Sequence, residues 1–179
     1  MHKEYAIVRD QTGWKNQSRI IGECCEFYVL HNVGCVRCNA LNSLCKLKAN
    51  TKSKDLHCSK CNQNYQIKAK AIQKGKVPIN LKLLGGEYNT TLYSINEKLD
   101  YIIVLYDKDC LSNAVVVIHV PFEYVNRSCI IARKPLSSTA VRAGWQGCYI
   151  QFDLTKAHVL ARAQRNGRIG TKHYYIIIA

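Results

Sequence analysis

Two pairs of cysteines constrain the fold of this chain more than any other feature of its sequence. Cys35 and Cys38 form one CxxC pair, Cys58 and Cys61 form a second, and nineteen residues, 39–57, separate them. Four thiolates at this spacing suit one tetrahedral Zn²⁺, which would close the loop between the two pairs. A redox CxxC pair and buried free thiols are the alternatives.

The ten cysteines of the 179-residue chain also bear on its cellular setting. The N-terminus, MHKEYAIVRD, contains no apolar run suited to a signal peptide, and the longest apolar stretches, such as AVVVIHV, have the length of strands. We therefore expect neither secretion nor a membrane span. A cytoplasmic setting keeps thiols reduced, so the paired cysteines indicate metal binding rather than disulfides.

The charge of the chain indicates a polyanionic partner. Lys and Arg number 26 against 12 Asp and Glu, which gives a formal net charge of +14. A surplus of this size is typical of proteins that bind nucleic acid or an acidic surface. The basic residues are dispersed along the chain, which favours a folded binding surface over a basic tail. A solvated basic face without a partner is the alternative.

Apolar periodicity predicts a mixed α/β fold, with residues 1–179 in one domain and a cysteine-rich insertion at about 34–62. Residues 16–30 predict a helix that packs through Ile20, Cys24, Phe27 and Leu30, and a second helix at 88–99 follows a turn signal at 85–86. Predicted strands lie at 65–71, 101–107, 114–120, 129–134, 149–154 and 174–179. Residues 155–167 suit either a helix or a strand, and residues 133–148 predict a long loop.

A carboxylate and a lysine accompany the second cysteine pair in the stretch KDLHCSKCNQNYQIKAK, residues 54–70. Gln66 and Lys68 lie two residues apart on a predicted strand, so both belong to its polar, outward face. A turn closed by zinc would bring Asp55 beside Lys68. A carboxylate that binds Mg²⁺ next to a lysine suits phosphodiester hydrolysis. Ordinary solvated surface side chains are the alternative.

The predicted loop at 133–148 combines cations with one aromatic residue. Arg133, Lys134 and Arg142 can bind phosphates, and Trp145 stands between Gly144 and Gly147, where the backbone can approach a ligand closely. Such a segment suits entry into a DNA groove. A buried Trp145 that anchors the loop is the structural alternative.

Together these motifs resemble the catalytic domain of the DpnI-type, methyladenine-dependent restriction endonucleases of the PD-(D/E)XK superfamily. The resemblance runs from about residue 14 to 154, in order through WKNQSRIIGE, the two CxxC pairs, DLHCSKCNQNYQIKAK, GGEY, YIIVLYDK and RKPLSSTAVRAGWQGC. It implies a mixed sheet flanked by helices with an inserted four-cysteine zinc knuckle. It also implies a restriction role in a prokaryotic cytoplasm.

The resemblance assigns roles to single positions. Asp55 matches the metal-binding Asp of the family, Lys68 its catalytic Lys, and Gln66 stands where the family has Glu. The four paired cysteines match its structural zinc ligands. A neutral Gln66 still offers a carbonyl oxygen to Mg²⁺ but supplies no charge. The resemblance implies that an acid of the first helix assists, and we expect Glu23 to take this part.

The expected function is that of a Mg²⁺-dependent type II restriction endonuclease acting on double-stranded DNA at GATC-like sites that carry N6-methyladenine. We expect a monomer or a transient dimer. The resemblance implies that the loop at 133–148 recognises the site, with Trp145 touching the methyl group. We expect no C-terminal winged helix. A zinc-containing DNA-binding module that does not cut, and a related nuclease with another DNA target, remain alternatives.

Overall fold

The computed structural model describes residues 17–48, 51, 54–72, 77–107, 116–134, 137–142, 144–163 and 169–170. The helices in these ranges are α2 (Gln17–Asn32), α3 (Tyr88–Asn96) and α4 (Ser138–Arg142), with 3₁₀ turns η1 (Phe122–Tyr124), η2 (Arg127–Cys129) and η3 (Leu154–Lys156). The strands are β1 (Leu44–Lys46), β2 (Leu56–Cys58), β3 (Asn64–Ile72), β4 (Asn80–Glu87), β5 (Asp100–Asp107), β6 (Val116–Val120), β7 (Ile130–Ala132), β8 (Gly147–Asp153), β9 (His158–Ala163) and β10 (Ile169–Gly170).

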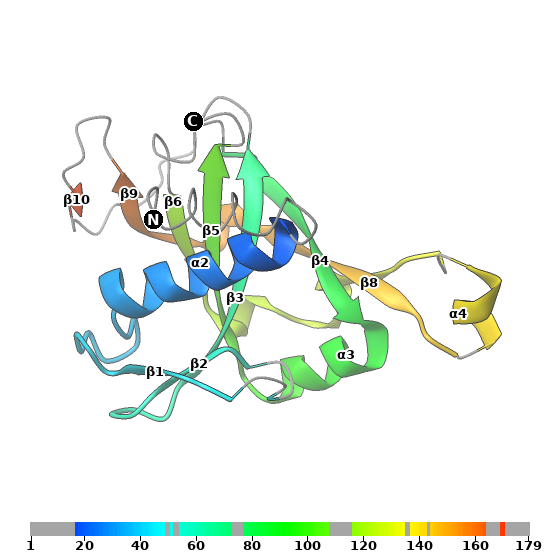
Figure 1. Ribbon diagram of the computed structural model, residues 1–179, viewed down its shortest axis with the longest axis horizontal. Helices are drawn as coiled ribbons and strands as arrows, with labels where there is room; N and C mark the ends of the chain where they lie inside the picture. The colour runs from blue at the N-terminus through cyan, green and yellow to red at the C-terminus, as the bar shows by residue number, and fades with distance from the viewer. Residues whose placement is uncertain are drawn as a thin grey trace.

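Two β-sheets form the framework (Figure 1). The larger has seven strands in the order β1-β2-β3-β5-β6-β9-β10, and the smaller has three in the order β4-β8-β7. β3 and β5 run parallel, whereas β5 and β6 are antiparallel, so the larger sheet is mixed. The chain passes from β3 through β4 and α3 before it returns to β5. The predicted mixed α/β class, with helices flanking a mixed sheet, is confirmed.

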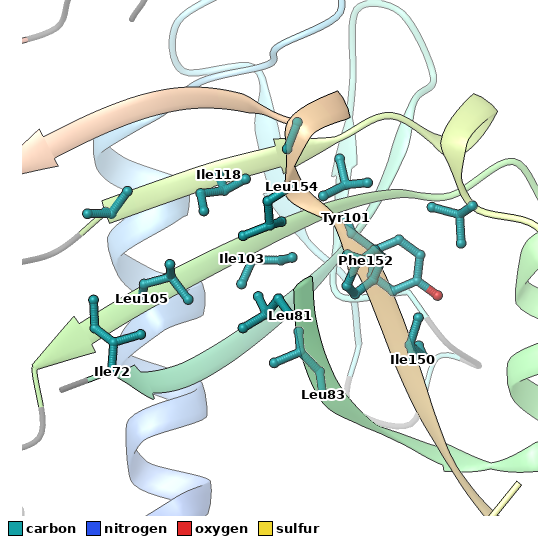
Figure 2. Close-up of a cluster of buried hydrophobic side chains, with 14 residues drawn as sticks. Ile72, Leu81, Leu83, Tyr101, Ile103, Leu105, Ile118, Ile150, Phe152 and Leu154 are labelled. Carbon is teal, nitrogen blue, oxygen red and sulfur yellow. The ribbon is translucent and has the colours of Figure 1, made fainter. Parts of the chain in front are cut away.

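One apolar core lies between the two sheets (Figure 2). Side chains of β5 face those of β4 and β8, and their alternation along each strand directs every second residue inward. The rings of Tyr101 and Phe152 lie 5.1 Å apart at a tilt of 57°. The labelled members of this core are Ile72, Leu81, Leu83, Tyr101, Ile103, Leu105, Ile118, Ile150, Phe152 and Leu154.

A second core lies on the other face of the larger sheet, where α2 crosses β3 and β5 (Figure 1). The predicted helix is confirmed, but its predicted packing face is only partly right: Leu30 packs against this core, whereas Phe27 does not. Cys25 and Val29 are buried against the sheet, whereas Phe27 is 63% exposed and stacks on His31 at 4.1 Å. Apolar residues occur around the whole helix, so periodicity alone does not select the buried side.

The predicted turn at Gly85 and Gly86 is wrong, because β4 runs through both residues. A β-bulge lies between Leu84 and Gly86, opposite β8. A side chain at Gly85 would begin 2.4 Å from the Cys148 sulfur, and Gly86 has a φ of +108°, which side-chain-bearing residues rarely adopt. The predicted second helix is confirmed as α3, and the Glu87 carboxylate accepts hydrogen bonds from the first backbone N–H groups of that helix.

The prediction of one long loop at 133–148 is partly wrong. It contains the short helix α4, and β8 begins at its end (Figure 1). The segment at 155–167, left open by its sequence pattern, holds strand β9, and the strand predicted at 174–179 lies outside the described residues. No helix in the described part of the chain is long and apolar enough to cross a membrane.

A partly buried ion pair, between Arg37 and the fully buried Asp100, joins the cysteine-rich segment to the larger sheet. Arg37 donates from Nε and Nη2 to the two oxygens of Asp100, each at 2.7 Å, and Asp100 has no exposed surface. Asp100 also meets His119 Nε2 at 2.9 Å and accepts from the Phe122 N–H at 2.9 Å. Burial acts to raise the pKa of Asp100, but the hydrogen bonds from His119, Arg37 and Phe122 hold it below its usual value. Arg37 reaches the exposed Glu123 as well.

Removing the arginine of this pair should be costly. Arg37→Ala leaves the Asp100 carboxylate buried without its main cationic partner, so we expect the free energy of unfolding to fall by about 3 kcal/mol. Chemical denaturation followed by circular dichroism measures this change. Glu123→Gln is the control, because an exposed ion pair contributes less than about 1 kcal/mol. Equal effects of the two substitutions would contradict the importance of the pair with Asp100.

Candidate metal centre and active site

The four paired cysteines converge on one point. Their sulfur atoms all lie within 4.8 Å of one another, with 3.4 Å between Cys35 and Cys61 and 3.7 Å between Cys38 and Cys58. Four sulfurs bound tetrahedrally to Zn²⁺ at about 2.3 Å lie about 3.8 Å from each other. The cluster predicted from sequence spacing is therefore present and is compatible with a structural zinc ion.

The two CxxC turns share a local geometry. An asparagine follows each pair in the left-handed region, with φ of 52° at Asn39 and 60° at Asn62. Asparagine adopts this conformation at lower cost than most residues, because its short polar side chain bonds locally. The N–H of Cys35 donates to the Ala40 carbonyl at 3.0 Å, and Cys58 donates in the same way to Gln63 at 2.8 Å. These bonds fold both turns so that their sulfurs face each other.

Neighbouring groups favour the thiolate form that zinc requires at Cys58, whereas burial raises the pKa of Cys38 and raises that of Cys61 to about 12. Burial acts to raise the pKa of Cys58, but hydrogen bonds from Ser43 and from the backbone of Cys61 and Lys60 lower it to about 6. The Tyr65 hydroxyl lies 3.1 Å from the sulfur of Cys35. Such contacts around the ligands orient a metal site. Cys58 and Cys61 of the cluster belong to the β2–β3 hairpin, and Tyr65 of β3 contacts Cys35 of the other pair.

Zinc binding can be tested by exchanging single exposed cysteines. Cys61→Ser removes one ligand and should lower the zinc content from about one ion per chain and lower the melting temperature. Elemental analysis and thermal melts followed by circular dichroism measure both. Cys45→Ser is the matched control, because Cys45 is exposed on β1 outside the cluster. A Cys61→Ser protein with full zinc and unchanged melting would refute the four-cysteine site.

Backbone pairing between β2 and β3 positions Asp55. Its N–H donates to the Tyr65 carbonyl at 3.0 Å, and its Oδ2 accepts from the Ile67 N–H at 2.7 Å. The two partners are the residues before and after Gln66, so these bonds hold Asp55 opposite Gln66 on the neighbouring chain segment. Burial raises the pKa of Asp55, the bond from Ile67 opposes this, and the nearby Lys68 charge lowers it. The carboxylate is therefore held in place beside the strand that carries Gln66 and Lys68.

The polar face of β3 is only partly exposed to solvent, since Lys70 is exposed but Gln66 and Lys68 are half-buried. Gln66 and Lys68 are paired in parallel register with Tyr101 and Ile103 of β5, which face the smaller sheet. Paired residues of neighbouring strands project to the same side. Burial lowers the pKa of Lys68, while the charges of Asp55 and Cys148 act to raise it. Lys68 thus lies half-buried between the sheets with Asp55 nearby.

Glu26 is an acid near this site that sequence reasoning missed. Its carboxylate forms an ion pair with Lys46 at 2.9 Å, and its charge raises the pKa of Asp55. Glu23, the helix acid expected to assist, is exposed, and its charge acts on Lys46. Glu26 is half-buried and follows the buried Cys25 in the sequence. Identifying the buried face of α2 correctly would therefore have pointed to Glu26 as the acid near Asp55.

The basic loop residues lie at one end of the smaller sheet. Trp145 is 39% exposed, and its ring lies so close to Gly147 that a side chain there would begin 2.9 Å from it. Arg133 is half-buried and Lys134 is exposed. Arg142 ends α4, and its side chain is outside the described part of the structure.

Comparison with protein-family models assigns the chain to a family. Residues 4–172 match the model described as DpnI, Dam-replacing family. The chain belongs to this family. Membership in the DpnI family implies a restriction endonuclease, hence a nuclease that acts on DNA, and suggests dependence on methylation. This match is longer than the resemblance of the sequence motifs, which spans about residues 14–154.

Proposed function

We propose that this DpnI-family chain is a Mg²⁺-dependent type II restriction endonuclease that hydrolyses DNA at adenine-methylated, GATC-like sites. The placement of the Asp55 carboxylate carries the proposal: it accepts from the backbone N–H of Ile67, the residue before Lys68, and the charges of Asp55 and Lys68 shift the pKa of each other. Membership in the DpnI family supplies the reaction class. Zinc at the four cysteines has a structural part, and the chain works as a monomer or a transient dimer.

The oxygen donors around Asp55 suit a hard cation. Mg²⁺ prefers carboxylate and carbonyl oxygens, and Asp55 with the Gln66 amide would supply both kinds. Bound there, Mg²⁺ would polarise the scissile phosphate and activate water. A helix acid completes the set: Glu23 was expected from the sequence, and the charge of Glu26 acts on Asp55. Lys68, kept close to a carboxylate, offsets negative charge that develops on the phosphate.

The loop between β7 and β8 is the proposed recognition element. Arg133, Lys134 and Arg142 would bind phosphates, and the half-exposed ring of Trp145 would contact the apolar methyl group in the major groove. Trp145 has an open ring surface for this contact, since it is less buried than an anchoring tryptophan of a core.

Cleavage of one plasmid in two methylation states tests the function. Purified protein with Mg²⁺ should cut the plasmid methylated at GATC and leave the unmethylated plasmid intact. Lys68→Ala and Asp55→Ala should each lower the rate by at least about a hundredfold, because each removes a charge from the reacting centre. Gel electrophoresis of time points measures the rates.

Thermal melts and zinc content of both variants are the controls for folding. Wild-type protein that binds methylated DNA in a gel-shift assay but cuts neither plasmid would favour a non-cleaving reader, which the neutral Gln66 makes the second candidate. Equal cutting of both plasmids would retain the nuclease and contradict the methylation preference.

Restoring the family's acid provides an independent test of metal binding. Gln66→Glu adds a carboxylate beside Asp55, so the Mg²⁺ concentration for half-maximal cleavage should fall several-fold. Titration of the cleavage rate with Mg²⁺ measures this. Asn96→Asp is the matched control, because Asn96 is exposed at the end of α3, away from β3, and the same charge change there should leave the titration unaltered. A fall of equal size in both variants would exclude a role of Gln66 at the metal.

A further inference from the structure

The outer face of the smaller sheet combines exposed apolar side chains with cations. Along β4 and β8, buried residues point to the core and exposed residues to the opposite side. Leu84 is 61% exposed and Ile131 is 37% exposed, and both pair in register with the half-buried Tyr149. Gly147 precedes Tyr149 by two residues on β8, and the ring of Trp145 covers Gly147. Here "outer face" denotes Lys82, Leu84, Ile131, Arg133, Trp145 and Tyr149.

Two cations converge on the aromatic ring at the centre of this face. Lys82 Nζ lies 4.3 Å from the centroid of the Tyr149 ring, and the Arg133 guanidinium carbon lies 5.0 Å from it. Lys82 belongs to β4 and Arg133 follows β7, the strands on either side of β8. Like charges gathered at one ring repel each other, although the ring attracts each of them. An anion between them would relieve this repulsion.

The carboxylates at the two ends of the face are engaged elsewhere. Glu87 accepts from the N–H groups of Asn89 and Thr90 at the start of α3. Asp153 accepts from the N–H and the hydroxyl of Thr155 at 3.0 and 2.6 Å. None of the ion pairs between residues in the described part of the chain involves Lys82 or Arg133. The centre of the face is therefore cationic.

We propose that this outer face binds the phosphate backbone of duplex DNA that flanks the cleavage site. The proposal rests on the proposed function and assigns Lys82 and Tyr149 to the same DNA. β7 and β8 lead directly into and out of the recognition loop, so DNA held by that loop can continue along the face (Figure 1). Lys82 and Arg133 neutralise phosphate, and Tyr149 holds both cations in position.

Salt-dependent DNA binding tests the proposal. Fluorescence anisotropy with a labelled duplex containing GATC, methylated or unmethylated, is measured across NaCl concentrations without added Mg²⁺. Lys82→Gln should weaken binding about five- to tenfold at 0.1 M salt and reduce the slope of log K against log salt by about 0.9, as for one phosphate contact. The loss should be equal for both duplexes, because phosphates carry no sequence information.

Variants of the ring and a distant lysine sharpen this test. Tyr149→Leu should weaken binding at least as much as Lys82→Gln, whereas Tyr149→Phe should bind as the wild type does, because it keeps the ring. Lys156→Gln makes the same charge change in η3, beyond the end of β8, and should leave the slope unaltered. Unchanged melting temperatures show that each variant is folded.

The outcomes separate this proposal from the proposed function. Wild-type cutting together with a Lys82→Gln slope equal to that of Lys156→Gln would refute the DNA-binding face and leave the nuclease in place. A loss confined to methylated DNA would refute a backbone contact, since Lys82 would then read the site. Absence of DNA binding and cutting by the wild type would overturn both proposals.

Discussion

The ion pair between Arg37 and Asp100 is the interaction on which the arrangement of this protein depends. Arg37 lies inside the first CxxC turn, and Asp100 is the first residue of β5. Burying a carboxylate without a cation is costly, so the position of the turn and that of the strand determine each other. β5 pairs with β3, the strand that carries Lys68. The cysteine cluster and the candidate active site therefore share one anchor.

The cysteine cluster contributes position rather than chemistry to the candidate site. Two of its cysteines, Cys58 and Cys61, belong to the turn between β2 and β3, and Asp55 precedes β2 on the other side of the same hairpin. Closing that hairpin bonds Asp55 to the backbone on both sides of Gln66, through its N–H to the Tyr65 carbonyl and through its carboxylate to the Ile67 N–H. A short segment of chain thereby presents a carboxylate, an amide and a lysine together, with no long-range contact among the three needed.

The candidate active site and the outer face of the smaller sheet differ in how their charged side chains are partnered. Glu26, Lys46, Asp55 and Lys68 form a series in which each charge acts on another, but burial still leaves the pKa of Asp55 raised and that of Lys68 lowered. The neutral Gln66 leaves this series without a further negative charge. The face around Tyr149 differs, because its two cations meet a ring instead of a carboxylate. That difference is what makes it suited to an external anion.

The sequence by itself determined the four-cysteine cluster, the main strands and the grouping of Asp55 with Lys68, because all of these follow from spacing within short segments. Tertiary structure alone decided which side of α2 is buried, because apolar residues surround that helix. The buried side in turn brings Glu26 near Asp55. It also turned Gly85 and Gly86 from an expected turn into a bulge. Gly85 is required by the close approach of Cys148, far from it in the sequence, and Gly86 by its positive φ. Likewise, only the packing of the second sheet shows that Lys68 lies between layers, because alternation along a strand defines two faces without saying what covers each.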